Sequence, residues 1–138
     1  MQSLEEPPQV CPGSSILIVD DIAEWRTQVR KMLESRPEWQ AVGEACDGLQ
    51  AIQIAAKLKP DLVLLDIGMP ALNGVDAARL IRQSSPSSRI IFVTQESDED
   101  VRMSALATGA EAYVLKANAA SELLPAVEAA LQTFTDQA

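Results

Sequence analysis

The sequence contains no histidine and only five aromatic residues among its 138 positions. Without histidine, the chain cannot build a Ser-His-Asp or Cys-His nucleophilic site, and it lacks the commonest zinc ligand. The two cysteines, Cys11 and Cys46, form no CxxC pair, which favours a thiol-reducing compartment. These absences exclude the usual general base and most kinds of zinc site.

Basic residues are also scarce, since 11 Lys and Arg stand against 20 Asp and Glu and give a net charge of -9. No basic stripe is available to bind the phosphates of nucleic acids or of anionic membranes. No apolar stretch approaches the length of about 18 residues that a spanning helix needs, and no signal sequence opens the chain. We therefore expect a cytoplasmic protein that binds neither membranes nor, directly, nucleic acid.

The remaining composition is that of one globular domain, with 47% hydrophobic residues. Residues 1–14 (MQSLEEPPQVCPGS) hold three prolines and little apolar content, a composition typical of a flexible tail. The domain is expected over residues 15–134. Residues 135–138 would then be a C-terminal end or a truncated linker.

Five short apolar segments alternate with helical patterns along the chain. Strands that are apolar without interruption are usually buried on both faces, as in a parallel sheet covered by helices. Because crossovers between parallel strands are right-handed, we predict an α/β fold with a single doubly wound domain. The predicted strands are residues 16–19, 39–46, 62–65, 89–94 and 112–116.

The helical segments are predicted from apolar periodicity and from end signals. A third helix is expected over about residues 75–83, and Ser97 followed by Asp100 predicts a capping box for the fourth, which Gly109 would end. Pro125 must lie in the first turn of the fifth helix or bend its axis. The apolar stripes of the first two helices are Ile22, Trp25, Val29, Met32 and Leu33, and Leu49, Ile52, Ala55, Ala56 and Leu58.

The segment PDLVLLDIGMP places Asp66 at the end of a buried strand, where an ionised carboxylate is costly unless it is paired or coordinated. Doubly wound sheets bind ligands at the carboxyl ends of their strands. In this chain those ends carry Asp20 and Asp21, then Asp66, Thr94 and Lys116. We expect these side chains to share one pocket.

Three carboxylates held close together require a cation, and oxygen ligands favour a hard ion such as Mg²⁺. A carboxylate in this setting can attack phosphorus and form an acyl phosphate. Lys116 and Thr94 would bind the phosphoryl oxygens, one by charge and the other by its hydroxyl. The pocket therefore predicts phosphoryl transfer onto Asp66.

Each of these residues also has a simpler interpretation. Asp20 can be a helix N-cap, Thr94 a strand-end hydroxyl or cap, and Lys116 a solvated lysine. Tyr113 lies in an apolar strand and can serve packing alone. Gly74 is expected to shape the loop after Asp66.

The blocks ILIVDD, DLVLLDIGMPALNG, IIFVT and AYVLK occur in an order and at a spacing that resemble the response regulator receiver domain of two-component signalling. The resemblance spans roughly residues 15–134. It implies a flavodoxin-like five-stranded parallel sheet of order 2-1-3-4-5 with five helices. The wording DIGMPALNG is most similar to the branch whose regulators carry a helix-turn-helix output domain. Transcription regulation is then expected if such a domain follows Ala138, and a protein partner otherwise.

The resemblance also implies roles for the pocket residues. Asp66 would accept a phosphoryl group from a phosphohistidine on a sensor histidine kinase. Asp21, Asp66 and the backbone carbonyl of Gly68 would ligate Mg²⁺, with Asp20 assisting through a water molecule. Such a chain is not an enzyme in the ordinary sense, because it catalyses only its own phosphotransfer and a slow autodephosphorylation.

The switching apparatus is implied in the same way. Lys116 would pair with Asp66 or its phosphoryl group, and Thr94 would close onto the phosphate while Tyr113 changes rotamer. The change would be read on the face formed by the fourth helix, the fifth strand and the fifth helix, as a homodimer or an effector contact.

Three positions depart from the family pattern or modulate it. The residue after Thr94 is usually small, but here it is Gln95, which would crowd the entrance or add an amide hydrogen bond to the phosphoryl group. Gly68 offers no side chain to position an attacking water, and Glu96 would repel or orient one. We expect slow phosphorylation by small donors and a phosphoryl lifetime of minutes or longer.

Other function classes agree less well with the sequence. An aspartyl-nucleophile phosphohydrolase of the haloacid dehalogenase class needs an acid two residues after its nucleophile, where this chain has Gly68. A non-phosphorylated interaction module on the same fold would be expected to lose a pocket residue, and none is missing. A dinucleotide site is excluded because no Gly-x-Gly turn follows the first strand.

Overall fold

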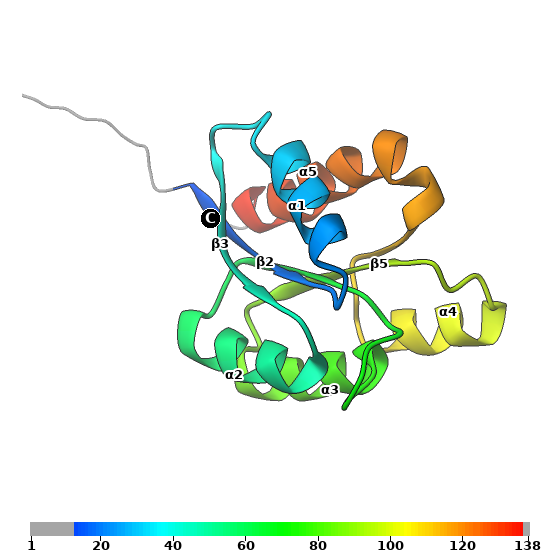
Figure 1. Cartoon of the computed structure of the whole chain (residues 1–138). Helices are drawn as coiled ribbons and strands as arrows, with labels where there is room; N and C mark the ends of the chain where they lie inside the picture. Colours follow the sequence, from blue (N-terminus) through cyan, green and yellow to red (C-terminus); the bar gives the residue numbers. More distant parts are fainter. Residues whose placement is uncertain (1–12, 137–138) are drawn as a thin grey trace, which may run out of the picture.

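The computed structural model describes residues 13–136, and Figure 1 shows their arrangement. The predicted tail over residues 1–14 lies outside the described residues except at its end, where Ser14 already belongs to the first strand. The elements in chain order are β2 (Ser14–Val19), α1 (Ala23–Leu33), β3 (Trp39–Ala45), α2 (Gly48–Leu58), β4 (Leu62–Leu65), α3 (Gly74–Ser84), β5 (Arg89–Thr94), α4 (Glu99–Ala107), β6 (Ala112–Leu115), the 3-10 helix η2 (Lys116–Asn118) and α5 (Ala119–Asp136).

The five strands form one parallel sheet in the order β3-β2-β4-β5-β6. Numbered by position along the chain, this is the order 2-1-3-4-5, so the predicted fold class is confirmed. The two central strands are aligned so that Val19 lies opposite Leu65. Because β2 and β4 end side by side, the residues that follow them meet at one edge of the sheet.

Helices cover both faces of the sheet, with α1 and α5 on one side and α2, α3 and α4 on the other (Figure 1). Alternate residues of β2 serve the two cores: Ile16 and Ile18 pack with α1 and α5, whereas Leu17 and Val19 pack with α2 and α3. Each such buried side chain contributes about 1.5–3 kcal/mol of transfer free energy. Within the described residues, no helix is both long and apolar enough to cross a membrane.

The residues that α2 buries differ from the apolar stripe that was predicted for it. Leu49 and Leu58 are 54% and 45% exposed, and the helix instead buries Gly48, Ala51 and Ala55. The small residues bring the helix close to its neighbours, since a Cβ added at Gly48 would lie 2.4 Å from the carbonyl oxygen of Leu72. The predicted stripe for this helix is therefore wrong at its two leucines and at Ala56, which is also exposed.

Helix ends also correct some predictions. Asp98, not Ser97, caps α4, because its carboxylate accepts the backbone N–H groups of Asp100 and Val101. Gly109 has the left-handed φ of +96° that was expected after this helix. Pro125 lies in the interior of α5 rather than in its first turn, since the helix begins at Ala119 directly after η2.

Candidate functional site

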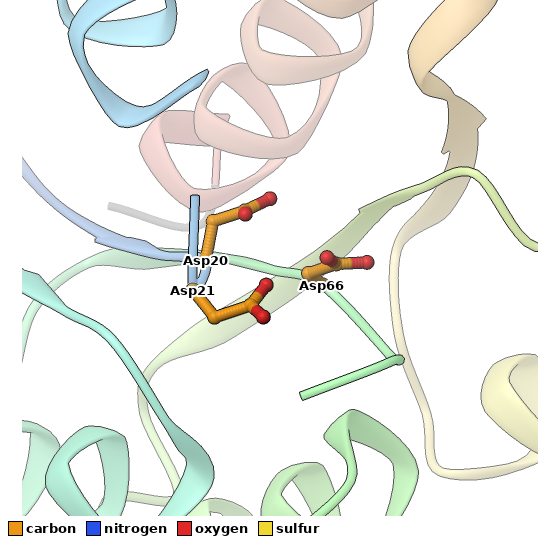
Figure 2. A group of neighbouring side chains, drawn as sticks. All are labelled: Asp20, Asp21 and Asp66. Carbon is orange, nitrogen blue, oxygen red and sulfur yellow. The ribbon is translucent and has the colours of Figure 1, made fainter. Parts of the chain in front are cut away.

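The carboxyl edge of the sheet brings together the five side chains singled out from the sequence. Asp20 and Asp21 follow β2 and Asp66 follows β4, and Figure 2 shows their three side chains projecting into one space. One oxygen atom from each carboxylate lies within 4.8 Å of the others. Thr94 ends β5 and Lys116 follows β6 at the same edge.

A cavity of about 440 Å³ opens at this edge. Asp20, which is 2% exposed, is not among the residues that line it, whereas Asp21 lines it and is exposed at the surface. Gln95 is also exposed and stands at the rim of the cavity. The lining residues are Asp21, Ile22, Asp66, Gly68, Thr94, Gln95, Glu96, Ser97 and Lys116.

Lys116 is the cation at the centre of the acidic group. Its Nζ atom lies 2.8 Å from Asp20 Oδ2 and 3.4 Å from Asp66 Oδ2, and its side chain is 8% exposed. The ring of Trp25 covers the ammonium group at 5.2 Å, a cation–π contact. The alternative of a solvated lysine is therefore wrong. No signal in the sequence pointed to Trp25, for which only a place in the apolar stripe of α1 was predicted.

The environment of Asp20 excludes the simple capping interpretation. Its Oδ1 atom accepts the N–H of Ile22, but the N-cap of α1 is Ile22 itself, which makes no side-chain cap bond. Burial raises the pKa of Asp20 above its ordinary value, and the charge of nearby Asp66 adds to the rise. Hydrogen bonds from Lys116 and Ile22 oppose it. A buried acid of this kind is stabilised by added positive charge.

Asp66 is held by its backbone and by the loop that follows it. Its N–H donates to the carbonyl of Val19 at 3.0 Å, and its side chain is largely buried. Gly74 approaches it so closely that an added Cβ would lie 1.9 Å from the Asp66 carbonyl oxygen. The Gly74 N–H also donates to the carbonyl of Ile67. The predicted role of Gly74 in shaping this loop is confirmed.

The loop between β5 and α4 forms hydrogen bonds with the side chains of both Thr94 and Tyr113. The Thr94 hydroxyl accepts the N–H of Glu96 at 3.2 Å, and the Tyr113 hydroxyl donates to the Glu96 carbonyl at 2.7 Å. Burial raises the pKa of Tyr113, with the charge of Glu96 contributing next. Tyr113 therefore does more than pack, since it fastens the loop that carries Gln95 and Glu96.

The donor set fits a hard divalent cation. All three carboxylates offer oxygen atoms, the ligands that Mg²⁺ prefers, and Lys116 supplies only one positive charge to the group. Gly68 lines the cavity, and an added Cβ there would meet nothing within 4 Å, so space remains open beside Asp66.

Comparison with known proteins decides the family. The sequence profile of the response regulator receiver domain matches residues 16–128. The chain belongs to this family. Receiver domains are regulators rather than enzymes in most cases, and an acidic cluster at this sheet edge agrees with that membership.

Several curated proteins are similar to this receiver domain. The nitrate/nitrite response regulator protein NarL of Escherichia coli is 38% identical over 117 residues, which cover 85% of this chain and 54% of NarL. The transcriptional regulatory protein DegU of Brevibacillus brevis is 36% identical over 117 residues, covering 85% of this chain and 50% of DegU. The chain thus spans about half the length of these relatives.

Solved receiver structures are similar in fold as well as in sequence. A LuxR-family two-component response regulator from an Aurantimonas species has a TM-score of 0.83 and 33% identity, covering 88% of this chain and 86% of that chain. The response regulator domain of Thermotoga maritima CheB has a TM-score of 0.81 and 34% identity, covering 87% and 97%.

Proposed function

We propose that this receiver domain is a phosphorylation-dependent switch in which Asp66 accepts a phosphoryl group from a phosphohistidine of a sensor histidine kinase. The observation that carries the proposal is the position of Asp66, whose carboxylate faces a cavity beside Asp20, Asp21 and Lys116. Membership of the receiver family supports it.

In the transfer step, a carboxylate oxygen of Asp66 attacks phosphorus while the P–N bond to the donor imidazole breaks. The electron pair of that bond leaves with the imidazole nitrogen, and Asp66 becomes an acyl phosphate. Mg²⁺, when bound, neutralises charge on the carboxylates and on the phosphoryl oxygens. Asp21, Asp66 and the Gly68 carbonyl would hold this ion, with Asp20 acting through a water molecule.

Lys116 and Thr94 bind the transferred group. Lys116 already lies within reach of Asp66 and supplies a point charge to a phosphoryl oxygen. Thr94 exchanges its hydrogen bond with the Glu96 N–H for one donated to the phosphoryl group. Because Tyr113 is bonded to the Glu96 carbonyl, movement of this loop changes the rotamer that Tyr113 prefers.

The signal leaves the domain through the face formed by α4, β6 and α5. This face contacts a second receiver or an effector partner, and in a longer protein with a DNA-binding domain the output is transcriptional. The similarity to NarL, a response regulator, and to DegU, a transcriptional regulatory protein, supports the transcriptional output. Gly68 has no side chain to position an attacking water, and the Glu96 carboxylate accepts the Asp98 N–H, so the phosphoryl group persists for minutes or longer.

The proposal is tested by intact-mass spectrometry after incubation with Mg²⁺ and acetyl phosphate, beside an Asp66→Asn control. One phosphoryl group is expected on the native chain, none on the control, and none after Mg²⁺ is chelated. A half-life of seconds in Mg²⁺ would contradict the slow hydrolysis. If no adduct forms on the native chain or on Gln95→Ala, the domain is a non-phosphorylated interaction module. Turnover of phosphate esters would instead show a phosphohydrolase.

A further inference from the structure

Besides the bond from the Asp20 N–H to the Ala45 carbonyl, one arginine side chain ties the junction between β2 and α1 to the edge strand. Arg26, in the first turn of α1, donates from Nη1 to the carbonyl oxygen of Asp20 at 2.6 Å and from Nε to Glu44 Oε1 at 2.8 Å. Its side chain is 17% exposed. Glu44 lies on β3, so the guanidinium group joins a helix, a strand and the loop that carries the acidic pair.

Arg30, one turn further along α1, offers a natural comparison. Its Nε atom donates to Glu44 Oε2 at 2.9 Å, and its Nη1 atom donates to the carbonyl of Ala41. Both arginines lower the pKa of Glu44, with Arg26 contributing most, so the carboxylate stays ionised between them. No hydrogen bond joins Arg30 to Asp20 among the described contacts, although both arginines carry the same charge in the same cluster.

The proposal rests on the proposed function and adds a residue to it. We infer that Arg26 is a positioning residue for the divalent cation site, acting through the carbonyl of Asp20. That carbonyl belongs to the planar peptide bond between Asp20 and Asp21, so fixing it limits the directions in which both side chains can leave the backbone. The Asp20 N–H is held separately by the Ala45 carbonyl, so Arg26 fixes the side of Asp20 that leads to Asp21. Without the Arg26 bond, repulsion among the carboxylates shifts this peptide bond.

If Arg26 acted only through its charge, its removal would change the Mg²⁺ affinity in the opposite direction from the change expected if it positions the loop. A positive charge near the site repels Mg²⁺, so its loss alone would tighten binding. Loss of the hydrogen bond to Asp20 would instead weaken binding, by roughly tenfold, as is usual for groups that orient metal ligands. Arg30→Ala removes an equal charge from the same cluster without touching the Asp20 carbonyl, and is therefore the matched control.

The experiment is a MgCl₂ titration of the whole chain, followed by the amide NMR signals of Asp21 and Asp66. We expect Arg26→Ala to bind Mg²⁺ roughly tenfold more weakly than the native chain, and Arg30→Ala to bind as tightly or more tightly. Arg26→Lys keeps the charge but lacks a planar fork for two acceptors, and its affinity should fall between the native and Ala values. A urea unfolding transition, measured for each variant with chelator present to remove Mg²⁺, shows whether that variant is folded without the ion.

Three outcomes would overturn the inference. They are native or tighter affinity in Arg26→Ala, equal weakening in Arg26→Ala and Arg30→Ala, and, if the Ala variant does not fold, native affinity in Arg26→Lys. Failure of the proposed function is separate, because the native chain itself would then show no saturable Mg²⁺ shift and no phosphoryl adduct on Asp66.

Discussion

Gly68 and Gly74 lie on either side of the loop after Asp66, and their surroundings are opposite. A Cβ at Gly74 would lie 1.9 Å from the Asp66 carbonyl oxygen, whereas a Cβ at Gly68 would meet nothing within 4 Å. The backbone at Gly74 cannot move away without disturbing Asp66, the proposed phosphoryl acceptor. The first glycine is thus open to substitution and the second is not.

This contrast gives a prediction on stability. Gly74→Ala should lower the free energy of unfolding by about 1–3 kcal/mol or more, because the added methyl overpacks against backbone rather than a flexible side chain. Gly68→Ala should change it by less than about 0.5 kcal/mol. Urea unfolding measures both, and similar values for the two variants would contradict the prediction.

Gln95 is exposed and lines the cavity that contains Asp66, so we expect it to limit access to that carboxylate. Gln95→Ala should speed phosphorylation by acetyl phosphate, since the smaller side chain opens the approach to the carboxylate. The rate of appearance of the phosphoryl adduct measures this effect, with Gln95→Glu as a control of similar size. A native rate equal to or faster than that of Gln95→Ala would refute it, and would favour a hydrogen bond from the Gln95 amide to the phosphoryl group.

Among the helices, α4 is packed least against the sheet. Only Ala105 of this helix is buried among its described residues, whereas α3 buries Gly74, Val75, Ala77, Ala78 and Ile81. Met103 on α4 is largely exposed. Elements with few buried apolar contacts open locally at low free-energy cost.

Hydrogen exchange should therefore distinguish these two helices. In the unphosphorylated chain, amides of α4 should exchange at least roughly tenfold faster than those of α3, because less burial opposes local opening. Amide exchange followed by NMR gives both rates in one sample, so α3 is an internal control. Equal protection of the two helices would show that α4 is held by contacts other than buried apolar surface.

Much of the element plan could be predicted from the sequence because the strands are short, continuous apolar runs. The strands over residues 62–65 and 89–94 have the predicted bounds. The first strand begins earlier than predicted, at Ser14, because its polar start is paired through the Glu38 carbonyl and Ser15 is bonded to Asp61. Those partners lie far away in sequence, where periodicity gives no signal.

In the site, too, some contacts could be predicted from the sequence and others could not. Strand ends and parallel pairing predict the gathering of Asp20, Asp21, Asp66, Thr94 and Lys116, because the order of the sheet fixes which residues share an edge. The contacts of Trp25 and Arg26 could not be predicted in this way. They depend on how α1 is rotated over the sheet, which is decided by packing rather than by spacing.

At the scale of the whole molecule, the net charge of -9 means that Mg²⁺ can stabilise the fold in two ways, by screening charge and by binding at a site. Any salt screens the repulsion among surface carboxylates, whereas site binding stabilises only the folded chain. At ten times its dissociation constant, Mg²⁺ should add about 1.4 kcal/mol to the free energy of unfolding, beyond NaCl of equal ionic strength. Urea unfolding of the native chain and of Asp66→Asn checks this, and an equal gain in both would assign the effect to screening.

The parallel register of the two central strands has a consequence for synthesis. Ser15 is bonded to Asp61, 46 residues further along the chain, and Ile16 lies opposite Leu62. β2 therefore lacks the neighbour on one of its two edges until β4 has also left the ribosome. Fragments that stop before Leu65 lack the neighbour that completes the sheet centre, so nascent chains of that length should be targets for chaperones and proteases.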